Sequence, residues 1–246
     1  MGFVLALEAS SRTYAVAAGD GERPRAQRAS RRDDPAFTGL GDLVAHTLAE
    51  SGAAFRDIAA IAVDIGPGGL SSMRAAVAYA NGLAFSLGVR LFPVTSLELM
   101  AIAAAEKHEG PFLCLRRGTG GSTYAGLFAD GQLAELRHGP HDSVVPSIAG
   151  GLDRVSLAGV PAADVAGLLP GVTVTDTGIA EADVTVLYQA ARAAMSDPER
   201  LVPIASPVNE ASLIFHNQAA RLARPRPFPA KHHCSHRSHP LTLHTR

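Results

Sequence analysis

Runs and alternations of apolar residues in the first hundred positions predict an ordered series of strands and helices. Residues 3–9 are apolar and β-prone, residues 10–12 form a polar turn, and residues 13–18 resume the strand, so the chain opens with a β-hairpin. A more polar third strand is predicted at residues 25–30. A helix with Gly52 as its C-cap is expected next, and the positions at helical spacing are Leu40, Leu43, Val44, Thr47 and Leu48.

The elements that follow alternate between strand and helix. Residues 58–65 form an almost continuous apolar run, which is typical of a strand covered on both faces. A helix is predicted at residues 70–87, a strand at 89–94 and a helix at 96–105. The order β-β-β-α-β-α favours a mixed sheet of the ribonuclease-H type, because a doubly wound Rossmann sheet would open with β-α-β. We therefore expect an α/β protein with an actin-like, two-lobed fold.

The second half of the chain opens in a similar way. Its predicted strands are residues 111–115, 123–129, 132–138, 153–158 and 172–176, and its predicted helices are 162–169 and 182–195. The similar openings are consistent with duplication. We expect an N-terminal lobe at residues 1–105, a smaller and diverged lobe at 106–205, and a disordered tail at 206–246 that is rich in His, Pro and Arg.

Composition narrows the class of protein. Only two cysteines occur, Cys114 and Cys234, so a disulfide framework is excluded and a reducing compartment fits. The start lacks the basic region of a signal peptide, and no apolar run is long enough to cross a bilayer. A cytoplasmic protein without a membrane partner is the resulting expectation.

Charge is distributed unevenly along the chain. Six basic residues and no acid follow Glu210, which leaves a net charge of −7 on the first 210 residues. Affinity for nucleic acid comes largely from phosphate neutralisation, so this part of the chain is expected to bind nucleic acid poorly on its own. An arginine cluster near the third strand leaves two interpretations open, contact with RNA or protection of a sheet edge, and its members are Arg23, Arg25, Arg28, Arg31 and Arg32.

The segment that joins the apolar strand to the long helix reads DIGPGGLSSMR, from Asp64 to Arg74. A phosphate cradle is one interpretation, since helix N-termini attract anions. The segment has neither the GxxxxGK[ST] pattern nor the GxGxxG pattern, so a tight strand-to-helix turn is favoured.

The long helix carries two uncharged faces. One is an apolar stripe of Leu70, Met73, Val77, Leu83 and Leu87; the other consists of small residues, Ala75, Ala78, Gly82 and Ser86. Arg74 is the only formal charge between Gly69 and Val89. A surface helix normally has a charged outer face, so the second face is covered either by another helix of this chain or by a partner. The partner alternative predicts a homodimer in isolation or a heterodimer.

Four segments together resemble the bacterial TsaB (YeaZ) family, of which this chain looks like a diverged member. They are VLALEAS from Val4 to Ser10, IGPGGLSSMR from Ile65 to Arg74, ANGLA from Ala80 to Ala84, and VTSLE from Val94 to Glu98. The family shows I-L-A-[IL]-D-[ST]-[AS], G-R-G-P-G-S-F-T-G-[LV]-R, K-G-L-A and G-V-[ST]-[ST]-L in the same order. The resemblance covers about residues 3–130.

The resemblance implies a non-catalytic scaffold in the pathway that makes threonylcarbamoyladenosine at position 37 of tRNA. Such proteins pair with a catalytic TsaD subunit, and the small ATPase TsaE docks onto the pair, so ATP and metal are expected on partner subunits and no cofactor on this chain. The implied partner-binding residues are Leu70, Met73, Arg74, Val77, Ala78, Asn81 and Gly82. The implied turn, a vestigial nucleotide site, comprises Glu8, Ser10, Asp64, Gly66, Pro67 and Gly68.

Several positions depart from the family pattern. Glu8 replaces an aspartate, Gly69-Leu70-Ser71-Ser72 replaces Ser-Phe-Thr-Gly, and Leu115-Arg116-Arg117 replaces Asp-Ala-Arg. The alternative function is a stand-alone actin-like nucleotide-binding enzyme, such as a small-molecule kinase or ATPase. Such an enzyme would need a phosphate loop and an acidic residue in its second lobe. At the position where the family has aspartate, this chain has Leu115. Peptidase activity is disfavoured because the sequence has no H-E-x-x-H motif.

Overall fold

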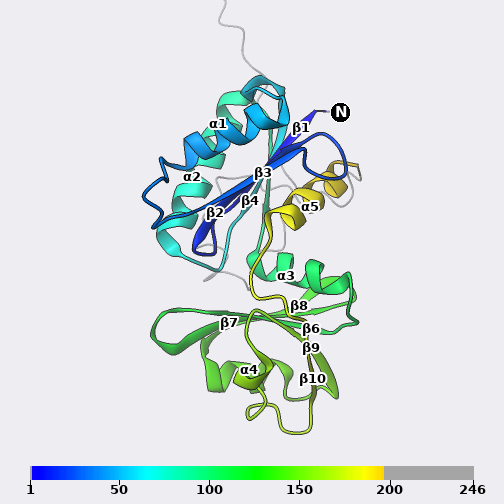
Figure 1. Cartoon of the computed structure of the whole chain (residues 1–246). Helices are drawn as coiled ribbons and strands as arrows, with labels where there is room; N and C mark the ends of the chain where they lie inside the picture. The colour runs from blue at the N-terminus through cyan, green and yellow to red at the C-terminus, as the bar shows by residue number, and fades with distance from the viewer. Residues whose placement is uncertain (1, 197–246) are drawn as a thin grey trace, which may run out of the picture.

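The computed structural model describes residues 2–196 and has two lobes, each built on a five-stranded mixed sheet (Figure 1). The first lobe contains β1 (Phe3–Glu8), β2 (Thr13–Gly19), β3 (Ala26–Arg31), α1 (Leu40–Ser51), β4 (Ile58–Asp64), α2 (Leu70–Leu87), β5 (Arg90–Val94) and α3 (Ser96–Ala105). The second contains β6 (Phe112–Arg117), β7 (Ser122–Ala129), β8 (Gln132–Pro140), α4 (His141–Ala149), β9 (Arg154–Ala158) and β10 (Thr173–Asp176). The last described helix is α5 (Val184–Ser196).

The two sheets share one topology. The first has the order β3-β2-β1-β4-β5, and the second has the corresponding order β8-β7-β6-β9-β10. In each sheet the first three strands run antiparallel, and the last two run parallel to the first strand. The predicted actin-like α/β fold with mixed sheets is confirmed, and the matching topologies fit the expected duplication.

The central strands β1 and β4 are buried on both faces, as their continuous apolar runs predict. Alternate residues point to opposite sides: Leu5 and Ile61 pack beneath α1 and α2, whereas Val4 and Ala60 face α5 and α3. Figure 1 shows α1 and α2 on one side of this sheet and α5 on the other. Helix α5 follows β10 in the chain, yet it packs on the first sheet, not the second.

Helix α3 lies between the lobes (Figure 1). Leu99 packs against the first sheet, while Leu97 and Met100 contact a cluster that contains Cys114 and Phe128 of the second sheet. A helix with apolar residues on opposite sides can enter two cores, which explains why α3 shows little amphipathic pattern in sequence.

Two elements differ from the sequence predictions. The helix predicted at residues 162–169 is a single 3₁₀ turn, Ala162–Asp164; Gly167, inside the predicted segment, disfavours a helix there. Helix α4 was not predicted, and Pro146 lies inside it. Buried Val144, Val145 and Ile148 hold α4 against the second sheet despite the proline. Within residues 2–196, none of the helices is both long and apolar enough to span a bilayer.

Candidate functional site

Strand β1 ends at Glu8, whose carboxylate is almost completely buried. Its Oε1 accepts hydrogen bonds from the backbone N–H of Ser10 at 2.6 Å and from the Ser10 hydroxyl at 2.5 Å. The N–H of Ser11 adds a longer bond of 3.3 Å. The side chain therefore folds back onto the polar turn that was predicted at residues 10–12 and fixes its shape.

The neighbouring parallel strand β4 ends at a second acid, Asp64, which is fully buried. Its Oδ1 accepts the N–H of Gly66 at 2.7 Å and the hydroxyl of Ser96 at 2.8 Å. Strands β1 and β4 are neighbours and parallel, so Glu8 and Asp64 lie together at the carboxyl end of the sheet. The Ser10 side chain faces both acids. We call Glu8 and Asp64 the carboxyl pair.

The carboxyl pair has an altered affinity for protons. Burial, and next the charge of Asp64, raise the pKa of Glu8 to about 7, although hydrogen bonds from Ser10 and Ser11 oppose the shift. Burial also raises the pKa of Asp64, against the hydrogen bonds of Gly66 and Ser96 and the nearby charge of Arg116. Both shifts favour the protonated form, so the carboxyl pair holds protons to a higher pH than isolated carboxyl groups do.

The loop after β4 lies directly on the turn after β1. The bond between Gly66 and Pro67 is cis, and the N–H of Gly69 donates to the Ser10 carbonyl at 3.0 Å. A Cβ atom at Gly68 would come within 2.3 Å of that same carbonyl oxygen, so only glycine fits there. The six residues of the predicted turn site, Glu8, Ser10, Asp64, Gly66, Pro67 and Gly68, thus lie together.

Two arginines of the chain bind the backbone carbonyls of the 10–12 turn. Arg116 of β6 donates to the Ser10 carbonyl at 2.7 Å. Arg32 donates to the Ser11 carbonyl at 2.9 Å and also binds the Ser72 hydroxyl at the start of α2. The groups presented here are carbonyls and carboxylates already bonded to the protein, and both repel phosphate. The geometry therefore agrees with a structural turn better than with a phosphate cradle.

Helix α2 buries one face and exposes the other. Met73 and Val77 are 1% and 4% exposed, and Val77 packs into the first core, so the structure assigns these two predicted partner-binding residues to the interior. Leu70 was expected on the same stripe but is 52% exposed. Asn81 is half-buried. We call the outer surface the α2 face; its exposed members are Leu70, Ser71, Arg74, Ala75, Ala78, Gly82, Phe85 and Ser86.

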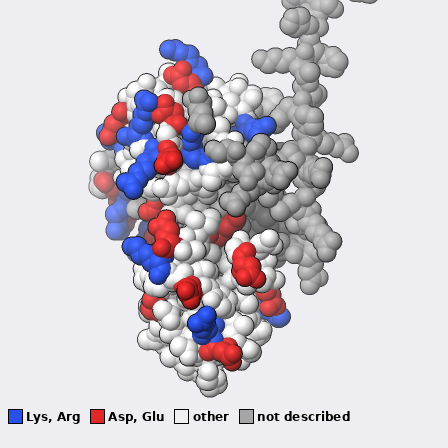
Figure 2. Space-filling view, turned by 90° about the vertical axis from the view of Figure 1, so that its right-hand side faces the viewer, with Lys and Arg blue, Asp and Glu red and all other residues white. Residues whose placement is uncertain are grey.

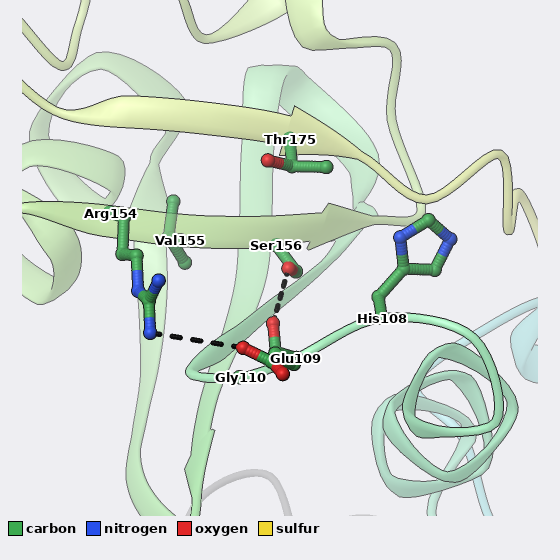
Figure 3. A pocket seen from close by; sticks show the side chains of 7 residues that line it. All are labelled: His108, Glu109, Gly110, Arg154, Val155, Ser156 and Thr175. Carbon is green, nitrogen blue, oxygen red and sulfur yellow. Dashed lines mark hydrogen bonds and ion pairs between the residues drawn. The ribbon is translucent and has the colours of Figure 1, made fainter.

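Two hollows among the described residues are small. One of about 140 Å³ lies at the start of β9 (Figure 3), where Arg154 approaches Glu109 at 4.0 Å and the Ser156 hydroxyl donates to the Glu109 carbonyl. The other, of about 90 Å³, lies between the lobes beside Gly66 and Pro67. Ligand pockets usually measure about 300–1,000 Å³, so neither has the size of a nucleotide site.

Charges on the surface are largely mixed. On the face shown in Figure 2, basic and acidic side chains are interspersed over both lobes. Around the edge strand β3, arginines pair with acids: Arg25 with Asp20 at 2.7 Å, Arg28 with Glu50 at 2.7 Å, and Arg31 with Asp33 at 2.9 Å. Paired arginines neutralise phosphate poorly, so edge protection is favoured over RNA contact.

Comparison with known proteins supports the resemblance to TsaB found in the sequence. A family model described as "TsaD: tRNA N6-adenosine threonylcarbamoyltransferase" matches residues 38–135. The solved structure of YeaZ from Pseudomonas aeruginosa has a TM-score of 0.63 and 21% identity over 81% of this chain and 94% of that chain. The chain is similar to TsaB (YeaZ). At this level of identity, the structural likeness establishes the shared fold.

A second solved structure gives the same result. It is described as an uncharacterized protein with similarity to peptidase YEAZ from Pseudomonas aeruginosa, with a TM-score of 0.62 and 22% identity over 83% of this chain and 99% of that chain. Both YeaZ-like structures are matched over nearly their whole length, so the two-lobed arrangement is common to all three.

Sequence reasoning missed three residues of these sites. Arg116 was noted only as a departure from a motif, and its contact with Ser10 spans 106 positions. Arg32 was grouped with the surface arginines, although it binds the turn. Phe85, at 77% exposed, was the strongest missed signal, because a large aromatic among small residues on one helix face could have been read from the spacing.

Proposed function

We propose that this chain is a non-catalytic partner subunit of the complex that makes threonylcarbamoyladenosine at position 37 of tRNA, and that it pairs through the α2 face with a TsaD-like catalytic subunit. ATP, metal and tRNA are then held by the other subunits, including a TsaE-like ATPase, and the assembly works in the cytoplasm. In isolation, the same face pairs two copies of the chain.

The exposed apolar surface of α2 carries this proposal. Leu70 and Phe85 stand at its two ends, 52% and 77% exposed, and Ala75, Ala78 and Gly82 lie between them. Small residues allow a partner helix to approach closely, while the two large side chains offer apolar area to bury. The family match over residues 38–135 includes the whole of α2.

The turn site supports the non-catalytic part of the proposal. An independent ATPase needs a cleft that admits phosphate, whereas Gly68 and Gly69 lie against Ser10, and Arg116 also donates to the Ser10 carbonyl. A titration with ATP and Mg²⁺ tests this point directly. Micromolar binding with turnover would support the stand-alone enzyme instead.

Pairing is tested by co-purification with the TsaD-like subunit of the same organism, followed by sedimentation. Ala78→Glu places a charge in the centre of the α2 face, and a buried unpaired charge costs about 3–5 kcal/mol, so we expect a folded chain that no longer binds the partner. Ala193→Glu is the matched control, because Ala193 is an exposed alanine of α5, on the opposite side of the same sheet. Equal loss of binding in both variants, or no binding by the unsubstituted chain, contradicts the proposal.

A further inference from the structure

An apolar hollow of about 90 Å³ lies between the lobes, at the loop that leads from β4 into α2. The first lobe contributes Ile65, Pro67 and Leu97 to its lining, and the second contributes Phe128 and Leu133. Ile65, Leu97 and Phe128 are almost completely buried, whereas Leu133 of β8 is 46% exposed. The hollow is thus built by both lobes, and an exposed leucine stands at its rim.

The hollow adjoins one end of the α2 face. Pro67 lines it, and Leu70, the first exposed member of the α2 face, follows three residues later. Consecutive Cα atoms are 3.8 Å apart, so those of Pro67 and Leu70 are separated by at most about 11 Å. A protein that covers the Leu70 end of the α2 face therefore lies close to the hollow as well.

The α2 face alone is too small for a stable interface. The helix has 18 residues. It is therefore about 27 Å long and roughly 10 Å wide, so that one face covers about 270 Å² in projection. A stable complex buries about 800 Å² on each partner. A partner that binds α2 must therefore cover neighbouring surface too.

Exposed apolar side chains indicate where the interface extends. Within residues 2–196, the large apolar side chains exposed outside α2 are Phe55, Ile102 and Leu133. Phe55 and Ile102 line neither of the two hollows, whereas Leu133 borders the one beside α2. The neighbouring helix α1 instead exposes charged groups, among them Asp42 and Glu50. Interface cores are depleted of such groups, so the second lobe offers the better continuation.

We propose that the TsaD-like subunit covers this hollow together with the α2 face and places one apolar side chain in it, so that the partner contacts both lobes. A cavity of about 150 Å³ binds benzene, so the smaller hollow has room for a single aliphatic side chain. Tyr124 and His138, whose rings stack at 4.1 Å, form a flat wall beside it. This inference rests on the proposed function and adds Leu133 of the second lobe to the surface that the partner recognises.

The affinity of the TsaD-like subunit, measured by calorimetric titration, provides the first test. Leu133→Glu places a charge at the rim of the hollow, where the partner would bury it, so we expect binding to weaken at least about tenfold. Ala134→Glu is the matched control, because Ala134 is the next exposed residue of β8 and does not line the hollow. It should change the affinity by less than about twofold. Circular dichroism checks that both variants remain folded.

Protection of a thiol at the rim provides the second test. Leu133→Cys is alkylated with and without the TsaD-like subunit, in a chain where Cys234→Ser removes a competing thiol. Cys114 is buried, and burial raises its pKa to about 12, so it does not react. We expect the partner to slow alkylation of Leu133→Cys at least about tenfold and to leave Ser143→Cys on α4 unaffected.

The outcomes separate this inference from the proposed function. If Ala78→Glu abolishes binding while Leu133→Glu binds like Ala134→Glu and Leu133→Cys stays reactive, pairing through α2 stands and the part assigned to the hollow is overturned. Protection of Leu133→Cys in the free chain also overturns it: a second copy covers the hollow if protection grows with concentration, and the chain itself covers it if protection does not. If the unsubstituted chain does not bind the TsaD-like subunit, the proposed function fails, and this inference fails with it.

Discussion

At the scale of single residues, two buried carboxyl groups define the end of the first sheet. Their positions could be predicted from sequence, because Glu8 and Asp64 each follow an apolar run that reads as a strand. Their environment could be predicted only in part. Ser10, Ser11 and Gly66 lie close in sequence to the acids that they bind, but Ser96 lies 32 positions after Asp64, and Arg116 donates to the Ser10 carbonyl from the second lobe. Patterns of neighbouring residues do not report such distant contacts.

The raised pKa of Glu8 predicts how stability changes with pH. Its folded pKa of about 7 lies above the ordinary 4.5, so its contribution is fully present below pH 4.5 and is lost as pH rises through 7. Glu8→Gln keeps the hydrogen-bond acceptor but cannot ionise. We expect similar unfolding free energies for variant and parent near pH 5, and a variant that is more stable by up to about 3 kcal/mol near pH 8.

Urea unfolding followed by circular dichroism at both pH values measures this difference. Glu106→Gln serves as the control, because Glu106 is an exposed glutamate outside the cluster. If the two variants follow the same pH dependence, the stabilising proton does not reside on the carboxyl pair.

At the scale of elements, the periodicity of apolar residues along the sequence predicted most strands and the long helices correctly. It failed at two segments of the second lobe. Helix α4 was not predicted, and Val144, Val145 and Ile148 hold it against the second core although Pro146 lies inside it. The opposite error occurred at residues 162–169, where Val165 and Leu169 are buried without a regular helix. Burial by tertiary packing, which sequence spacing does not reveal, decided both cases.

The exposed phenylalanine of α2 gives a prediction for the element as a whole. Phe85 contributes little to the fold because 77% of its surface is accessible, so Phe85→Ala should change the unfolding free energy by less than about 0.5 kcal/mol. If the α2 face pairs with a partner, the same change should weaken pairing by about 2 kcal/mol or more. Phe55→Ala, at a residue 37% exposed and outside α2, is the control. Calorimetric titration with the partner subunit distinguishes the two, and equal affinities would place the interface elsewhere.

At the scale of the whole molecule, the lobes are joined by more than a linker. Helix α3 contributes to the cores of both sheets, and α5 returns from the second lobe to cover the first sheet. This return was not predictable from the order of elements, because α5 follows the strands of the second sheet directly in sequence. The apolar stripe of α5 could equally have matched either sheet. The structure shows Leu187 and Tyr188 completely buried against β1 and its neighbours, with the Tyr188 hydroxyl donating to the Gly21 carbonyl.

These shared elements predict that the two lobes unfold as one cooperative unit. Leu187 lies in the core of the first lobe and Leu157 in that of the second, and both are fully buried. Leu187→Ala or Leu157→Ala should each destabilise the chain by about 2–5 kcal/mol. Each should also shift the transition of both lobes, since α3 cannot leave one core without exposing the other.

Hydrogen exchange of peptides from β4 and from β7, measured against urea concentration, follows the lobes separately. Leu133→Ala, at a residue 46% exposed, is the matched control and should shift neither transition by more than about 1 kcal/mol. If Leu157→Ala shifts the β7 transition alone, the lobes unfold independently, and α3 and α5 do not couple them.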